Sequence, residues 1–199
     1  IADDSLILEK FKPQNISNTL WACATLGYEN KPLFAQFSTH LLSAIDQPIA
    51  EKITSQDISN TLWALASLGY QDQNFFNKCA IYLLLGKQQP CTDFSPQEIA
   101  ITLWAFAVQQ ALINDTAPPL ISIHHYFSVD QLSQCNKQEI NQIYDYSLVF
   151  DVNLLSASAL KRDICTSDFI ISATEKQFSN ILNQVFPNRF TSQYKMPNT

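Results

Sequence analysis

Histidines are the side chains that most often transfer protons or bind metals near neutral pH, and this chain of 199 residues has three of them. His124 and His125 are adjacent, so on a helix their rings would point about 100° apart and would seldom share a metal ion. His40 lies in an amphipathic stretch, where a histidine is ordinarily at the surface or hydrogen-bonded. The histidines therefore predict neither a catalytic site nor a metal site.

Cysteines are the other candidate nucleophiles and metal ligands, and the five are widely spaced: Cys23, Cys79, Cys91, Cys135 and Cys165. An odd number without C-x-x-C spacing argues against a disulfide framework and a zinc site. The chain also contains no H-E-x-x-H, G-x-S-x-G, P-loop or G-x-G-x-x-G. We predict a protein without catalytic activity or cofactor, in a reducing intracellular compartment such as bacterial cytoplasm, an organelle or a host cell after secretion.

The spacing of the tryptophans indicates the helices that would position any site. Trp21, Trp63 and Trp104 stand 42 and 41 residues apart. They lie in three related segments, FKPQNISNTLWACATLG, ITSQDISNTLWALASLG and FSPQEIAITLWAFAVQQ, which begin at residues 11, 53 and 94. A fourth, altered copy, CNKQEINQIYDYSLVF, begins at residue 135 and has Asp145 in the tryptophan position. Such a period is typical of stacked helical units.

Each copy carries the residues that begin a helix. Ser95 and Glu98 form a potential capping box around Pro96, which suits the first helical turn. The second and fourth copies fill the same two positions with Thr54 and Asp57, and with Asn136 and Glu139. Four helices are therefore expected to begin at equivalent points.

The helix ends differ among the copies. Gly27 and Gly69 predict left-handed residues after the first two helices, whereas Gln110 predicts a longer third helix. A second helix follows in the first two copies, where apolar residues recur every three or four positions. In the third copy we predict a loop at NDTAPP and then a helix from about Leu120 to Phe127. A last helix is predicted within residues 171–186.

The expected fold is all-α, an α-solenoid of about four helix-pair repeats of 41–42 residues plus C-terminal helices. Residues 1–150 form the repeat domain, and residues 151–199 form a C-terminal helical cap and tail. One helix pair cannot bury its apolar face alone, so identical neighbours bury it together. We interpret Trp21, Trp63 and Trp104 as packing between repeats rather than as stacking on a ligand.

A candidate contact surface lies opposite the apolar arc of the first helix in each unit. A helical wheel places Gln56, Asp57, Asn60, Ala64 and Ser67 there in the second copy. The equivalent positions supply the candidate ligand contacts Asn15, Asn18, Thr25, Asp57, Asn60, Ser67, Glu98, Ile101 and Gln142. Modular RNA readers use such side chains, although ordinary solvent exposure explains the same variation. Ile101 and Val108 suggest that the third unit is covered by another segment or a partner.

Charge restricts the choice of partner. Residues 1–150 carry 14 acidic and 7 basic side chains, a net charge of −7, and residues 151–199 carry 4 and 5, a net charge of +1. A surface that follows phosphates should be basic, so charge favours a basic protein over RNA. The longest apolar runs are far shorter than the roughly 20 residues that cross a bilayer, so no membrane partner is expected. Because residue 1 is Ile, we expect an excerpt of a longer chain.

The core Q-x-I-x-N-T-L-W-A-x-A-x-L-G resembles the helical repeats found upstream of RAP domains in bacterial and organellar proteins, relatives of octotricopeptide and FAST-kinase-like repeats. The segment INQIYDYSLVF is similar to the variant repeat that closes such arrays, and SATEKQFSNILNQVF is similar to the helix that leads into a RAP domain, which would begin about where this chain ends. The resemblance implies an α-solenoid that takes part in RNA processing, stability or translation, and some bacterial members are suspected of acting inside host cells. The alternative is a protein-binding scaffold, such as a bacterial effector module.

Overall fold

A computed structural model describes residues 10–46, 53–85, 93–113 and 120–150, and every regular element within them is helical. The helices that we call the A-helices begin where the repeats predict: α2 (Pro13–Leu26), α4 (Ser55–Ser67), α6 (Pro96–Leu112) and α8 (Lys137–Val149). The remaining elements are α3 (Lys31–Asp46), α5 (Gln73–Leu85), the 3-10 helix η2 (His124–Tyr126) and α7 (Val129–Ser133). The predicted cap at 151–199, with its helix at 171–186, lies outside the described residues.

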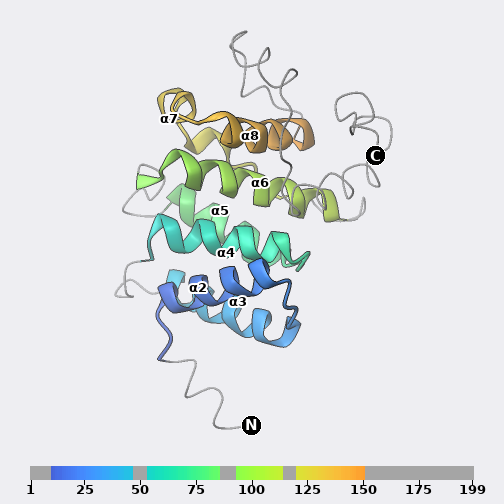
Figure 1. Ribbon diagram of the computed structural model, residues 1–199. Coiled ribbons are helices and arrows are strands. Elements are labelled where there is room, and N and C mark those ends of the chain that lie inside the picture. The colour runs from blue at the N-terminus through green and yellow to red at the C-terminus, as the bar shows by residue number, and fades with distance from the viewer. Residues whose placement is uncertain (1–9, 47–52, 86–92, 114–119, 151–199) are drawn as a thin grey trace, which may run out of the picture.

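The A-helices lie side by side in chain order, from α2 in blue to α8 in orange (Figure 1). The most extensive contacts between helices are those between successive A-helices. Helices α3 and α5 form a second layer and contact each other much less. The repeat in the sequence therefore corresponds to a repeat in space, with the A-helices as its tightly packed layer.

Capping boxes fix the start of three A-helices, as the sequence predicts. The backbone N–H of Asp57 donates to Thr54 Oγ1 at 3.1 Å, and the N–H of Thr54 donates to Asp57 Oδ2 at 3.1 Å. The same reciprocal pairs begin α6 and α8: Ser95 with Glu98, and Asn136 with Glu139. Each box satisfies N–H groups that have no partner inside the helix, which stabilises the helix start by about 1 kcal/mol.

The ends of the A-helices also follow the prediction. Gly27 has a φ of 64°, and the next N–H, from Tyr28, returns to the carbonyl of Cys23 at 2.9 Å. Gly69 has the same φ, so both units reverse direction at a residue without a Cβ. Helix α6 has Gln110 at this position and continues to Leu112.

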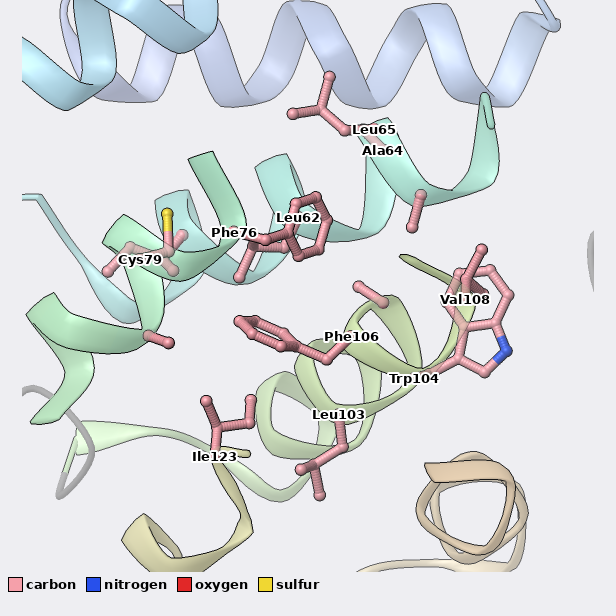
Figure 2. Close-up of a cluster of buried hydrophobic side chains, with 14 of the residues drawn as sticks. Leu62, Ala64, Leu65, Phe76, Cys79, Leu103, Trp104, Phe106, Val108 and Ile123 are labelled. Atoms are coloured by element: carbon pink, nitrogen blue, oxygen red, sulfur yellow. The ribbon is translucent and has the colours of Figure 1, made fainter. Parts of the chain in front are cut away.

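The core runs from one unit into the next. Phe34 meets Tyr70 of the second unit edge-on at 5.7 Å, and Phe76 meets Phe106 of the third at 5.2 Å between ring centroids. Figure 2 shows Phe76 and Phe106 facing each other, with Leu62 beside them. Small side chains keep the A-helices close at fully or almost fully buried positions: Ala64, Ala66, Ala105 and Ala107. Burying one Leu or Phe side chain contributes about 1.5–3 kcal/mol, so stacking stabilises each unit.

The helix predicted from Leu120 to Phe127 is wrong. Only His124–Tyr126 form a 3-10 turn, and α7 follows it. Side chains from three helices bind backbone N–H groups of this segment: Gln110 Oε1 accepts from Leu120 at 2.7 Å, Asn77 Oδ1 from Ile121 at 3.0 Å, and Tyr146 Oη from Ile123 at 3.0 Å. These bonds replace the helical ones, so tertiary contacts override the local helical pattern.

Candidate functional site

The A-helices of the first two units expose one row of side chains, which we call the open stripe. It runs along α2 as Gln14, Asn18, Trp21 and Thr25, and along α4 as Gln56, Asn60, Trp63 and Ser67. The spacing of four, three and four residues places each set on one helical face. All four members on α2 are exposed, whereas on α4 Gln56 is exposed and the other three are half-buried. The face is therefore open along α2 and partly covered along α4.

Two indoles occupy the centre of the open stripe. The ring centroids of Trp21 and Trp63 are 6.4 Å apart and their planes are tilted by 33°. This contact joins two repeats, yet Trp21 keeps 48% of its surface exposed. An exposed indole on a rigid helix is a ready surface for stacking, because it offers a large apolar face at little cost in side-chain entropy.

Amide side chains lie one turn before each indole. Asn18 is exposed and Asn60 is half-buried, and neither carboxamide is hydrogen-bonded within the described part of the chain. Thr25 is instead bonded locally, because its Oγ1 donates to the carbonyl of Trp21 at 2.9 Å. Asn15 is exposed, but its Oδ1 accepts from the N–H of Lys12 at 3.0 Å at the helix start. The two carboxamides can therefore each offer a donor and an acceptor to a ligand.

Asp57 was expected on the outer face, and the structure buries it. Its side chain is 6% exposed, and its Oδ1 accepts from Ser17 Oγ of the first unit at 3.0 Å. Its Oδ2 also accepts from Thr54 Oγ1 at 2.7 Å. Ala64, expected on the same face, is fully buried. The wheel misplaced both residues because an A-helix is covered on two sides, by the preceding and the following A-helix, and not only by its own partner.

Glu98 belongs to the same kind of link between units. Its Oε2 accepts from the N–H of Ser95 at 2.7 Å, and its Oε1 accepts from Ser55 Oγ of the second unit at 3.4 Å. The carboxylates at this helix position thus cap their own helix and bind the unit before it. We assign Asp57 and Glu98 to the framework rather than to a ligand surface.

The open stripe closes at the third unit. Ile101 is half-buried, Trp104 is 2% exposed and Val108 is 1% exposed. Figure 2 shows Trp104 and Val108 next to each other on α6. On α8, Gln142 is half-buried and Asp145 is buried in the tryptophan position. Burial of the third unit's outer face agrees with the apolar residues found there in the sequence.

His124 and His125 do not point apart as a helical arrangement would require, because their ring centroids are 3.8 Å apart. The Nδ1 of His124 shares a hydrogen bond of 2.7 Å with Ser122 Oγ, which lies 3.0 Å from Tyr146 Oη. Burial, and then the positive charge of His125, lowers the pKa of His124. No group of three or more potential metal ligands occurs among the residues that the structure describes.

Burial suppresses the reactivity of two of the thiols that the structure describes, Cys79 and Cys135. Cys23, Cys79 and Cys135 are free and buried. Burial, and then the nearby Asp72, raises the pKa of Cys79 far above its ordinary value, while burial and then Glu139 raise the pKa of Cys135 to about 11. Cys79 and Cys135 are therefore protonated near neutral pH and are poor nucleophiles.

Sequence reasoning found part of the stripe and missed its centre. It listed Asn18, Thr25, Asn60 and Ser67 as ligand contacts, but it interpreted Trp21 and Trp63 as packing between repeats and did not count Gln56 and the equivalent Gln14 among the contacts, although the wheel placed Gln56 on that face. The sequence did contain a signal for this face. In both copies Gln, Asn, Trp and a hydroxyl residue follow one another at a spacing of four, three and four residues, which places them on one helical face.

Comparison of the chain with family models, curated proteins and solved structures finds no match. Among the described residues, none of the helices combines the length and the apolar character that a membrane crossing requires.

Proposed function

We propose that residues 10–150 form a non-catalytic α-solenoid module that recognises a linear macromolecule along the open stripe. The observation that carries this proposal is the contact of exposed Trp21 with half-buried Trp63, beside the unengaged carboxamides of Asn18 and Asn60. Stacking surfaces and free amides at regular intervals suit a ligand that is itself repetitive, because each unit can contact one segment of it.

The packing of the layers supports the solenoid. The A-helices contact each other extensively, whereas α3 and α5 contact each other little. When the helices of one layer pack more closely than those of the other, the stack curves toward the more closely packed layer. In this proposal the A-helices form the inner, concave side, and the open stripe lies on it.

RNA is one candidate ligand, and the resemblance to repeats that precede RAP domains supports it. Indoles stack on bases, and carboxamides bind base edges. A protein segment is the second candidate, and charge favours it. The A-helices contain four carboxylates against a single lysine, Lys137, and no arginine: the carboxylates are Asp57, Glu98, Glu139 and Asp145. We further propose that the protein acts in a reducing compartment, because Cys23, Cys79 and Cys135 are free thiols.

Crosslinking in cells tests the proposal. The protein is recovered from cells after crosslinking, any RNA is sequenced and any protein is identified. The same is done with the double variant Asn18→Ala and Asn60→Ala. We expect recovery of a specific ligand to fall at least fivefold in the variant, while its thermal unfolding is almost unchanged, because these side chains lie outside the core. Equal recovery by the two proteins would reject the open stripe as the binding surface.

A further inference from the structure

We infer that the flank of α2 that faces away from α4 docks a further unit of the same repeat, carried before α2 in the same polypeptide. This flank, which we call the leading face, consists of five positions of the first unit: Asn15, Thr19, Ala22, Leu26 and Tyr28. The inference concerns a contact between units, and it does not depend on the ligand that the open stripe binds.

The equivalent positions of the second unit form an interface with the first unit. They are Asp57, Thr61, Ala64, Leu68 and Tyr70. Asp57 accepts from Ser17 Oγ of the first unit at 3.0 Å, and the ring of Tyr70 meets Phe34 of the first unit edge-on at 5.7 Å. The spacing of four, three and four residues from Asp57 to Leu68 places the helical members on one face. The second unit therefore docks on the first through this set of positions.

The third unit docks on the second through the same positions. Glu98 accepts from Ser55 Oγ of the second unit at 3.4 Å, and Gln109 Nε2 donates to the carbonyl of Tyr70 at 2.7 Å. Between them on the same face, Thr102 and Ala105 are fully buried. Two successive interfaces thus use one set of helix positions, and the leading face of α2 is the third occurrence of that set.

The first unit keeps the interface residues at positions that are open to solvent. Four of its five leading positions hold the same residue as the second unit, namely Thr19, Ala22, Leu26 and Tyr28. Yet Leu26 is 81% exposed, and Asn15, Ala22 and Tyr28 are also exposed. Of the four large apolar side chains that are exposed within the described ranges, three belong to this end of the stack: Trp21, Leu26 and Tyr28.

This exposure is unlike the end of a repeat array. A terminal unit ordinarily has a polar outer face, because that face remains in water, whereas a group of exposed apolar side chains marks an interaction surface. None of the five leading positions is charged. The leading face therefore has the character of an internal interface between units.

The contacts between the first two units define what the leading face accepts. Towards α4, the first unit presents the hydroxyl of Ser17 as a donor and, four residues later, the indole of Trp21 as a ring partner. Asn15 occupies the position of Asp57, and its carboxamide oxygen accepts from a hydroxyl as a carboxylate does. A preceding unit with a hydroxyl residue four positions before a tryptophan thus complements the leading face.

The protein isolated from the cells that make it provides the direct test. We expect mass spectrometry of the intact protein and of its peptides to find a segment before Ile1. That segment should contain a tryptophan 41–42 residues before Trp21, with Ser or Thr four positions earlier, because the units keep this spacing. A natural chain that begins at Ile1, or one whose preceding segment lacks this pair, would overturn the inference.

A duplicated unit tests the docking itself. A second copy of residues 11–52 is inserted after residue 10 of the full chain, so that the original α2 follows another unit at the natural spacing of 42 residues. Ala22→Glu is then made either in the original α2 or in the inserted copy. In the original α2 the carboxylate would be buried between units, and we expect the urea midpoint of unfolding to fall by about 1 M or more.

The inserted copy is the matched control. There the same position faces solvent, so we expect Ala22→Glu to shift the midpoint by less than about 0.3 M. Equal shifts from the two substitutions would show that the added unit does not dock on the leading face, and would overturn the inference. The mass-spectrometric test stands even if the duplicated chain does not fold.

Sedimentation analysis of the unmodified chain tests the competing occupant, which is a second copy of the same molecule. We expect a monomer, because docking of a repeat unit needs the side that α2 presents to α4, and in each copy α4 already covers that side. A dimer that Ala22→Glu dissociates would overturn the inference, since the leading face would then join two copies rather than two units of one chain.

Discussion

The first two units and the last two differ in what their A-helices present to solvent. On α2 and α4 the face that carries the tryptophans is open, and Trp21 is 48% exposed. On α6 and α8 the same face is closed, because Trp104 is 2% exposed and Asp145 is buried. The same helix position therefore has two roles. It contacts ligands in the first half, by our proposal, and it belongs to the core in the second half.

The hydrogen bonds of the two halves differ in the same way. The first half is joined by Asp57, which connects one A-helix to the next through Ser17. In the second half side chains such as Tyr146 and Gln110 hold an irregular segment in place. The two regular units expose the same helix face, whereas in the irregular third unit the equivalent face is buried. The comparison shows how an irregular unit ends the exposed face of a repeat array.

The largest effects are expected when the tryptophans are substituted one at a time. We expect Trp104→Ala to lower the free energy of unfolding by about 3–5 kcal/mol, because it empties a buried site. Trp21→Ala should cost only about 1–2 kcal/mol, because half of its surface is already in water. Trp63→Ala, which is half-buried, should lie between them. Urea unfolding followed by circular dichroism measures all three, and equal costs for Trp21 and Trp104 would remove the distinction between the halves.

A smaller effect is expected from the carboxylates that link the units. Asp57→Ala removes the cap of α4 and the hydrogen bond from Ser17 Oγ, which then keeps only the carbonyl of Gln14 at 3.1 Å, so it should cost about 1–2 kcal/mol. Glu98→Ala removes a half-buried cap and a longer contact, and should cost about 1 kcal/mol. Chemical denaturation of the two variants compares them directly. A larger loss for Glu98→Ala would contradict the assignment of the stronger link to the first half.

The smallest expected effect is a dependence on pH that is confined to the second half. The folded protein lowers the pKa of His124, so between the folded and unfolded values the unfolded chain binds more protons. Stability from this group is therefore complete above the ordinary histidine pKa of about 6.5 and declines as the pH falls below it. We expect the free energy of unfolding to decrease from pH 7.5 to pH 5.5 in the natural protein and to decrease less in His124→Asn. An unchanged slope in the variant would exclude His124 as the source.

The sequence by itself determined the units. The spacing of Trp21, Trp63 and Trp104, the capping pairs and the glycines placed the A-helices and their ends, because these signals act through local backbone chemistry. The same local reasoning also predicted the closed face of the third unit, from Ile101 and Val108. It did not establish whether the tryptophans face a neighbour, a ligand or both.

Only the tertiary structure decided which sides of each helix are covered. A helical wheel describes one helix with one apolar side, but an A-helix inside a stack has neighbours on both flanks. Asp57 and Ala64 are therefore buried, and Trp21 is exposed on the same face as Asn18. The segment from Leu120 to Phe127 shows the same limit, since side chains of α5, α6 and α8 bind its backbone and keep it from forming the helix that its residues favour locally. The burial of a helix face by its neighbours and the hydrogen bonds between distant segments depend on the assembled stack. The sequence of a single helix does not determine them.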